Sequence, residues 1–236
     1  MDGLVSCIPW PWPIFGGGGA ETVEMGTLSS SRQRDVEKLQ IVAFDFDGTL
    51  TVTDSYTAFL FWSAGPFGRL ARLAGLIPDA IRYVADGDRG QLKAAAARAF
   101  LGRKPVNQLA EETERFVEER FDSLLRPDAL ACWRRWGEAG ARRVIVTASP
   151  ELVVAPFARR LGADSLIATV LEADEAGLIT GRLATPNCRG PEKVVRLIAA
   201  FGPDIELAAA YGDTGGDTEM LAFAGEGHYR VFTGKP

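Results

Sequence analysis

The sequence predicts an α/β fold: a doubly wound, Rossmann-like parallel sheet with an inserted helical cap domain. Short apolar runs alternate with helical segments after residue 38, which is typical of a parallel sheet covered by helices. The helical stretch between the first two runs is too long for a single crossover, so it indicates an insertion. The expected division is a disordered tail at 1–38, an α/β core at 39–58 and 124–236, and a helical cap at 59–123.

The individual elements follow from apolar runs and helix-start signals. Residues 39–45 form a short apolar run, which predicts a strand buried on both faces. Residues 55–139 show a helical pattern, in which four prolines stand where a helix can begin: Pro66, Pro78, Pro105 and Pro127. The rest of the core is expected as strand 142–147, helix 150–161, strand 166–170, a hairpin at 172–182, helix 191–201, strand 206–211, helix 218–224 and strand 228–232.

The first 38 residues are rich in Pro, Gly and Ser and lack a helical or strand period, so we expect a flexible tail. Four consecutive glycines at 16–19 do not form a phosphate loop, because no strand precedes them and no Gly-Lys-Ser/Thr follows. The N-terminus lacks the charged and apolar regions of a signal peptide, and no apolar run is long enough to span a membrane. These features predict a cytoplasmic protein, with peripheral contact at the inner membrane as an alternative.

Composition excludes several kinds of active site. The chain has 236 residues, one histidine and three cysteines, with a net charge of −5. The acidic balance argues against nucleic-acid binding, which needs a basic surface. A hydrolytic triad would have to use His228, and no cysteine or histidine cluster exists to hold zinc. Chemistry would therefore depend on carboxylates, hydroxyls, cationic groups and a hard metal ion, and three widely spaced cysteines favour a reducing compartment.

Two carboxylates follow the first predicted strand. Asp45 and Asp47 stand two residues apart, so both leave the strand on the same side, and Gly48 permits a sharp turn after them. One carboxylate can attack phosphorus, while the other can protonate a leaving oxygen and later activate water. Solvated acids at a strand end are the alternative for this motif taken alone.

Hydroxyl and cationic side chains follow later elements of the core. Thr147 and Ser149 end the second strand before a helix opened by Pro150, where they would bind a phosphoryl oxygen or act only as helix caps. Lys193 lies in the first turn of a helix, where the helix dipole disfavours a cation, so a nearby anion is expected. A solvated surface lysine is the alternative, and Arg189 is a competing cation.

A last pair of acids, Asp213 and Asp217, follows a buried strand and is spaced by glycines. Carboxylates so placed can hold a hard divalent cation, while an acidic turn is the alternative. All four motifs would lie at the C-terminal ends of predicted strands, where open α/β sheets bind ligands. In this order they are far more specific together than any one of them alone.

These motifs resemble those of haloacid dehalogenase superfamily phosphatases: Asp-x-Asp-Gly-Thr-Leu at 45–50, then Thr147, Lys193 and Gly-Asp-x-x-x-Asp at 212–217. The resemblance covers 39–232, and the helical insert resembles the C1 cap of the phosphoserine-phosphatase-like branch. Asp47 separates the chain from dehalogenases, which lack an acid at this position, and from transport ATPases, which carry a threonine there.

The resemblance implies a Mg²⁺-dependent phosphomonoesterase that acts through an aspartyl-phosphate. Asp45 would be the nucleophile, and Asp47 would be the general acid and then the base, with its backbone carbonyl bound to Mg²⁺. The phosphoryl group would be bound by Thr147, Ser149 and Lys193. The metal would be held or supported by Asp45, Asp47, Asp213 and Asp217.

The substrate is less closely specified than the chemistry. Phosphoserine phosphatases usually carry a glutamate where this chain has Asp54, Ser-Gly-Gly where it has Thr-Ala-Ser at 147–149, and an asparagine where it has Gly216. The loop around Lys193 and the Thr-Ala-Ser-Pro sequence look more like a bacterial subgroup that includes phosphatidylglycerophosphatase C. That subgroup acts on a lipid phosphate at the inner membrane. We expect a small or lipid phosphate ester, with Asp54 and Arg189 on the substrate or cap side.

The expected cap carries a basic, partly apolar stretch. Residues 66–104 contain eight Lys or Arg against three Asp, interleaved with apolar side chains. Such a stretch can contact an anionic membrane surface, while a pair of cap helices with solvated arginines is the alternative. Phosphoserine as substrate, a phosphotransferase and a non-catalytic module on the same fold are the other functional alternatives, and the oligomeric state is left open.

Overall fold

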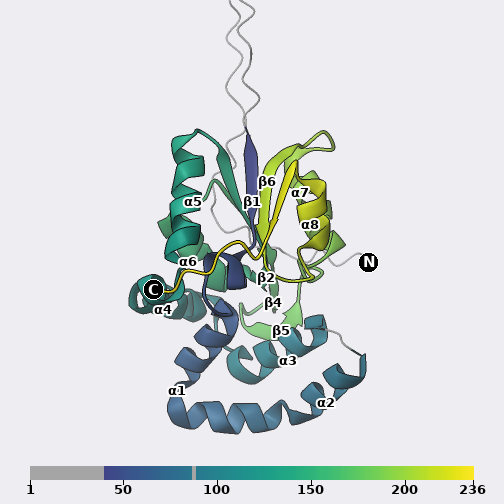
Figure 1. Ribbon diagram of the computed structural model, residues 1–236. Helices are drawn as coiled ribbons and strands as arrows, with labels where there is room; N and C mark the ends of the chain where they lie inside the picture. Colours follow the sequence, from purple (N-terminus) through teal and green to yellow (C-terminus); the bar gives the residue numbers. More distant parts are fainter. Residues whose placement is uncertain (1–39, 87–88) are drawn as a thin grey trace, which may run out of the picture. The chain divides into compact units, whose positions relative to one another are not determined.

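In the computed structural model the described residues are 40–86 and 89–236 (Figure 1). The flexible tail expected at 1–38 lies outside them. The described chain begins with β1 (Ile41–Phe44), the central strand of a five-stranded parallel sheet whose order is β3-β2-β1-β6-β7. The other four strands are β2 (Arg142–Pro150), β3 (Ser165–Thr169), β6 (Leu207–Gly212) and β7 (Glu226–Tyr229).

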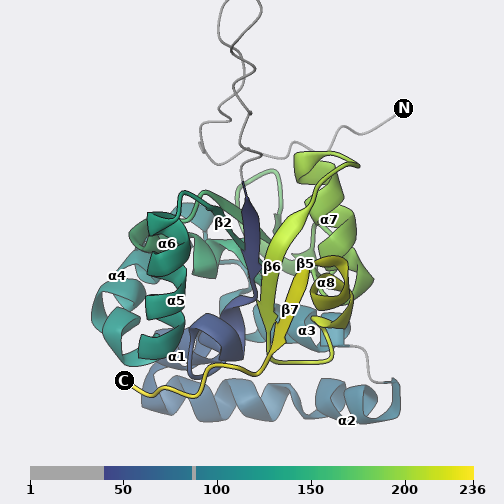
Figure 2. The ribbon, with the colours of Figure 1, turned by 45° about the horizontal axis from the view of Figure 1, so that its top comes forward.

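Alternate side chains of β1 enter two different hydrophobic cores. Val42 and Phe44 belong to one core, and Ala43 belongs to the other, so the strand is buried on both faces. Helices α5 and α6 cover one face of the sheet, while α7 and α8 cover the other (Figures 1 and 2). These helices are α5 (Pro127–Glu138), α6 (Glu151–Leu161), α7 (Pro191–Phe201) and α8 (Thr218–Phe223). The doubly wound sheet predicted from the sequence is therefore confirmed.

A block of helices is inserted between β1 and α5, as the sequence predicts. It follows the short turn η1 (Phe46–Leu50) and consists of α1 (Ser55–Gly75), α2 (Ile77–Asp86), α3 (Arg89–Leu101) and α4 (Val106–Leu124). Gly65 has φ +64° and interrupts α1, so Pro66 opens the second half of this helix. Pro105 and Pro127 also stand at helix starts, whereas Pro78 is the second residue of α2. The cap boundaries at 59 and 123 stay a prediction.

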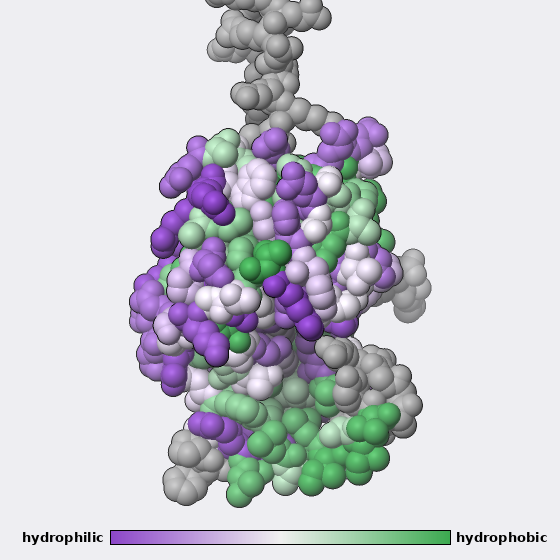
Figure 3. Space-filling view, in the orientation of Figure 1, coloured by the Kyte–Doolittle hydropathy of each residue, from purple (hydrophilic) through white to green (hydrophobic). Residues whose placement is uncertain are grey.

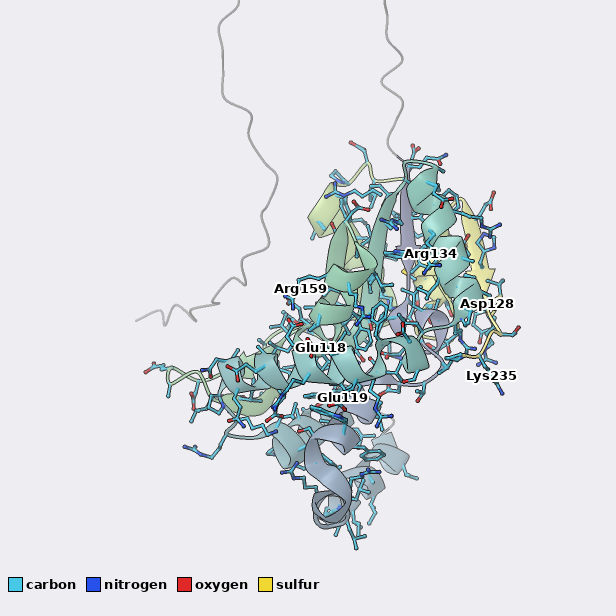
Figure 4. All side chains as sticks on the ribbon, turned by 90° about the vertical axis from the view of Figure 1, so that its left-hand side faces the viewer. Glu118, Glu119, Asp128, Arg134, Arg159 and Lys235 are labelled. Atoms are coloured by element: carbon cyan, nitrogen blue, oxygen red, sulfur yellow. The ribbon has the colours of Figure 1, made fainter. Side chains whose placement is uncertain are left out.

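Polar contacts connect α4 to its neighbours on both sides. Trp62 of α1 donates a hydrogen bond from Nε1 to Glu119 Oε2 at 2.7 Å. On the other side, Arg159 of α6 pairs with Glu114 of α4. Figure 4 shows Arg159 and Glu119 on opposite sides of α4. The inserted helices are thus tied to the core through α4 and α6.

The predicted hairpin is formed by β4 (Leu171–Ala173) and β5 (Ile179–Leu183), and it packs against α3. Residues 103–106 exchange backbone hydrogen bonds with residues 177–179. Gly181 allows the close approach: it has φ +81°, and a Cβ there would lie 2.6 Å from the Arg98 Cα. The hairpin therefore supports the α3 side of the cap.

One strand differs from its predicted position. The last strand was expected at 228–232, but β7 pairs with β6 through residues 226–229. Residues beyond it are held without strand pairing, with Phe232 stacked on Tyr211 at a centroid distance of 5.3 Å. The apolar run that suggested a strand thus packs on the sheet without joining it. Within the described ranges, none of the helices is long and apolar enough to cross a bilayer.

Candidate active site

The segments after β1 and β6, the C-terminal end of β2 and the start of α7 surround a cavity of about 550 Å³ between the sheet and the cap helices. Parallel strands all present their C-terminal ends at this edge, which brings distant motifs together. Every residue predicted for the site lines the cavity: Asp45, Asp47, Asp54, Thr147, Ser149, Arg189, Lys193, Asp213 and Asp217.

Lys193 joins the first and last motifs. Its Nζ donates hydrogen bonds to Asp45 Oδ1 at 2.6 Å, Asp217 Oδ1 at 2.6 Å and the Val146 carbonyl at 2.7 Å. The lysine is 1% exposed, and both carboxylates are also buried. The anion expected near this first-turn lysine is thus present as two carboxylates. Because its three donors are already used, Lys193 would have to release one acceptor to bind a phosphoryl oxygen.

Burial and charge work against each other in this cluster. Burial raises the pKa of Asp45 to about 7, although Lys193 acts in the opposite direction. Burial alone would lower the pKa of Lys193, but the charges of Asp45 and Asp217 outweigh it and raise this pKa. For Asp217, burial favours the neutral form, yet Lys193 and the Thr214 donors hold its pKa below the usual value.

Asp47 has a different set of partners. Its Oδ1 accepts the Ser55 backbone N–H at 2.7 Å, and its Oδ2 accepts the Ser149 hydroxyl. Burial raises the pKa of Asp47, and the charge of Asp54 adds to the effect. The two carboxylates of the first motif therefore have different surroundings: Asp45 contacts the charged Lys193, and Asp47 contacts only neutral donors.

The second motif places two hydroxyl side chains at the C-terminal end of β2. Thr147 is buried, and its Oγ1 accepts the Ser149 backbone N–H at 3.0 Å. The Ser149 hydroxyl is directed to Asp47, which gives this serine a positioning role in addition to the phosphate contact expected of it. Phosphate binding by Thr147 and Ser149 stays a prediction.

Three carboxylates gather where a cation would fit. Asp45, Asp213 and Asp217 each offer one oxygen, and these oxygens lie within 4.8 Å of one another. Gly48 allows the turn after Asp47 to approach Asp213 closely, because it has φ +81° and a Cβ there would lie 2.2 Å from Asp213 Oδ2. An all-oxygen, anionic donor set suits Mg²⁺. The residues present therefore fit a divalent cation.

Hydrogen bonds hold both carboxylate oxygens of Asp217 in place. Its Oδ1 accepts Lys193, and its Oδ2 accepts the backbone N–H groups of Asp213 and Thr214 at 3.2 and 2.9 Å. It therefore shapes the loop that presents Asp213. The Asp47 side chain lies outside the gathered group, and binding of the metal by its backbone carbonyl stays a prediction.

Asp54 and Arg189 both line the cavity. Asp54 is exposed and caps α1, accepting the Thr57 N–H at 2.6 Å. Arg189 lies on the core side, where its Nη1 is 3.3 Å from Thr214 Oγ1 and its guanidinium packs against Gly216. Whether either residue contacts substrate stays a prediction.

Three side chains of the site escaped the sequence analysis. Lys93 of α3 reaches the core, donating to the Ala148 carbonyl and lying 3.3 Å from Asn187 Oδ1. Arg126 donates from Nε to the Gly48 and Thr51 carbonyls, both at 3.2 Å, and so fixes the turn after Asp47. The Tyr56 hydroxyl is buried at the cavity and has no hydrogen-bond partner among the described residues. Lys93 counted only as a cap cation in the sequence, and no local pattern marks the other two.

The cavity has two chemically distinct halves. The core side carries the carboxylates, hydroxyls and cations described above. The cap side is mainly apolar and is lined by Leu60, Phe61, Leu73, Leu76, Leu92 and Phe100. A polar reacting group would thus meet the core, while an apolar portion of the same molecule would contact the cap.

The chain matches known proteins over most of its length. The haloacid dehalogenase-like hydrolase family matches residues 42–222. Protein CicA of Caulobacter vibrioides is 58% identical over 199 residues, covering 83% of this chain and 88% of that protein. Phosphoserine phosphatase SerB1 of Mycobacterium tuberculosis is 26% identical over 209 residues, covering 85% of this chain and 68% of that protein.

Solved structures share the architecture. A Bordetella pertussis protein of unknown function has a TM-score of 0.66 and 26% identity, with 78% of this chain and 86% of that chain covered. A phosphoserine phosphatase in its apo form has a TM-score of 0.53 and 20% identity, with 80% and 84% covered. The superfamily predicted from the four motifs is confirmed, and so is the fold class predicted from the alternation of strands and helices. The chain belongs to the haloacid dehalogenase-like hydrolase family.

Proposed function

We propose that the protein is a Mg²⁺-dependent phosphomonoesterase that acts through an aspartyl-phosphate on Asp45. The observation that carries the proposal is the separation of two neighbouring carboxylates: Lys193 holds Asp45 at 2.6 Å, while Ser149 and the Ser55 N–H hold Asp47. Two acids in different environments can divide nucleophilic and acid–base work. The family membership and the relative named a phosphoserine phosphatase support this assignment.

The proposed reaction has two displacements at phosphorus. A carboxylate oxygen of Asp45 bonds to phosphorus as the ester P–O bond breaks, and protonated Asp47 gives its proton to the leaving oxygen. Asp47 then takes a proton from a water molecule whose oxygen attacks phosphorus, and the bond to Asp45 breaks to release inorganic phosphate. Lys193 would offset the charge of Asp45, and the Thr147 hydroxyl would bind a nonbridging oxygen.

Mg²⁺ would be held by the carboxylates of Asp45 and Asp213 and by the Asp47 backbone carbonyl, with Asp217 supporting the loop. When bound, it supplies positive charge against the anionic phosphoryl oxygens. Gly48 keeps the turn close to Asp213, and Arg126 holds the Gly48 carbonyl, so the chain prepares the position of both metal-binding segments.

The apolar cap side of the cavity favours a phosphate ester with an apolar portion over phosphoserine. Phosphoserine would need a group to bind its amine, and one oxygen of Asp54, the acid expected there, already accepts the Thr57 N–H as the cap of α1. The buried Tyr56 hydroxyl at the cavity would donate to a polar group of the substrate next to its apolar portion. A cytoplasmic location and peripheral contact with an anionic membrane belong to the same proposal.

The test is hydrolysis of p-nitrophenyl phosphate by the full chain with Mg²⁺ and with EDTA. Asp45→Asn is expected to abolish turnover, whereas Asp122→Asn, which changes an exposed carboxylate on α4, should leave it intact. Beryllium fluoride should raise the melting temperature of the wild type, because it mimics the phosphoryl group on Asp45, and should not stabilise Asp45→Asn. A folded wild type that neither turns over phosphate esters nor binds beryllium fluoride would identify a non-catalytic module.

A further inference from the structure

Five large apolar side chains are exposed along the second half of α1 and along α2. We call this set the α1–α2 apolar face: Leu70, Leu73, Ile77, Ile81 and Val84. Leu70 and Leu73 are three residues apart on α1, and Ile77, Ile81 and Val84 are four and three apart on α2, so each group lies on one side of its helix. Leu70 is 76% exposed and Val84 is 84% exposed. Figure 3 shows apolar residues gathered over the region that α1 and α2 occupy in Figure 1.

This face differs from the rest of the described surface. The other exposed large apolar side chains are Val195, Tyr229 and Val231, and they do not form a comparable helical row. Isolated apolar side chains are common on protein surfaces, but a contiguous row marks a binding surface. Burying these side chains in the core would gain stability, so their exposure requires an explanation outside the fold itself.

We propose that the α1–α2 apolar face docks on the surface of an anionic lipid bilayer. Charge complementarity selects this partner. The cap stretch at 66–104 carries eight basic and three acidic residues in a chain of net charge −5. Lys93 is turned to the Ala148 carbonyl and Lys104 to Glu112, so six basic residues remain against the three acidic ones. Among the basic residues, Arg69 is exposed beside Leu70, and Arg98 and Arg103 are exposed on and after α3. An apolar row with an exposed arginine beside it, on a cap stretch of net positive charge, matches acyl chains below anionic headgroups.

The same charges disfavour a second copy of the chain as the partner. Two identical faces would bring two positively charged stretches together, and like charges that lose water on contact repel each other. A bilayer that contains anionic lipids instead offers opposite charge around an apolar interior. The apolar side chains and the cations can then be satisfied at the same time.

The face continues into the candidate active site. Leu73 is 42% exposed and also lines the cavity, and Leu76 lines it as well. The apolar row outside is therefore continuous with the apolar half of the cavity. This assignment rests on the proposed phosphatase function. Because the two apolar surfaces are continuous, we expect the substrate to be a lipid phosphate monoester. Its phosphate would reach Asp45 while its apolar chains stay against the cap and the bilayer.

The experiment measures sedimentation of the full chain with vesicles of phosphatidylcholine alone or mixed with phosphatidylglycerol. The test variant is Ile81→Asp/Val84→Asp, because both side chains are exposed and neither lines the cavity. The matched control is Val231→Asp, at an exposed apolar position outside the cap. We expect the wild type and the control to bind the anionic vesicles more tightly than the neutral ones. We expect the test variant to lose binding by roughly tenfold or more.

Hydrolysis of p-nitrophenyl phosphate separates docking from catalysis. The test variant should keep wild-type turnover of this water-soluble ester, while its turnover of a phosphatidylglycerophosphate in vesicles should fall with binding. Vesicle binding that is equal in the wild type and the test variant, or absent in the wild type, overturns the proposal. A wild-type dimer that the same substitutions dissociate also overturns it, in favour of self-association. If the wild type does not hydrolyse p-nitrophenyl phosphate, the proposed phosphatase function is refuted, while the vesicle-binding result still tests membrane docking.

Discussion

Replacing Lys193 by methionine tests the buried cluster most directly. The substitution keeps the length and much of the volume of the side chain but removes the ammonium group. Asp45 and Asp217 would each lose a charged partner at 2.6 Å, and the Val146 carbonyl would lose its donor at 2.7 Å. All these groups lie in a region where Lys193 is 1% exposed, so water cannot easily replace the lysine.

Removing one member of a buried ion pair typically costs about 3–5 kcal/mol, because the remaining charge is left without compensation. For a domain of this size, each kcal/mol lowers the melting temperature by about 2–4 °C. Lys193→Met is therefore expected to lower the melting temperature by roughly 6–20 °C in EDTA. Turnover should also be lost, since nothing would offset the charge beside the nucleophile.

Thermal unfolding followed by circular dichroism gives the readout, with Lys235→Met as the matched control near the C-terminus (Figure 4). The double variant Lys193→Met/Asp45→Asn should recover part of the loss, because a neutral amide replaces one orphaned carboxylate. A drop of less than about 2 °C for Lys193→Met would refute the reasoning, since burial of an unpaired carboxylate would then cost little. So would a double variant whose loss equals the sum of the single losses.

Ser149→Ala should lower kcat for p-nitrophenyl phosphate by about tenfold to a hundredfold, because Asp47 loses the hydroxyl that orients it. An unchanged kcat would show that Ser149 does not position the acid. Lys93→Met should raise KM for an anionic lipid ester by roughly tenfold with little change in kcat, and a fall in kcat alone would contradict a binding role. Asp128→Asn should cost about 1 kcal/mol of unfolding free energy at pH 7, since Asp128 accepts the Thr233 and Gly234 N–H groups at 2.7 and 2.8 Å. Burial tends to raise the pKa of Asp128, but these donors hold it below the usual value. This stability is therefore present above about pH 4 and is lost as pH falls through the lowered pKa. Urea unfolding at a series of pH values measures this, and a difference from wild type that does not shrink as the solution is acidified would contradict it. Finally, Mg²⁺ and inorganic phosphate together should raise the melting temperature more than the sum of their separate effects, and strictly additive shifts would argue against a shared site.

The core of the site could be predicted because its signals are local. An apolar run ending in Asp45 indicates both a buried strand and the edge at which its carboxylate emerges, and β1 places it there. The position of Lys193 against the helix dipole indicated a nearby anion, which the structure supplies from two distant segments. Sequence spacing thus predicted which groups meet, because parallel strands bring their C-terminal ends to one edge.

The remaining features depend on how the cap packs, and no local pattern encodes that. Lys93 reads as one of many cap cations until α3 packs against the core and brings it to Ala148. Arg126 precedes α5 of the core, and its partners are 78 and 75 residues away in sequence, so no local pattern marks it either. The last strand was displaced for a related reason: β7 is a largely exposed edge strand, so hydrophobic periodicity marks the apolar segment after it instead.

The charge balance of the cavity connects the metal, the cap and the substrate. Its described lining carries five carboxylates and three cationic side chains, an excess of two negative charges when all are ionised. A phosphate monoester adds up to two more negative charges in the same low-dielectric space, where repulsion is strong. A divalent cation held by the carboxylates would remove much of this repulsion. Lys93, one of the three cations in this balance, brings its positive charge from the cap. Metal and phosphate should therefore enter as a favourable pair, and the cap should contribute to phosphate affinity as well as to recognition of the apolar portion.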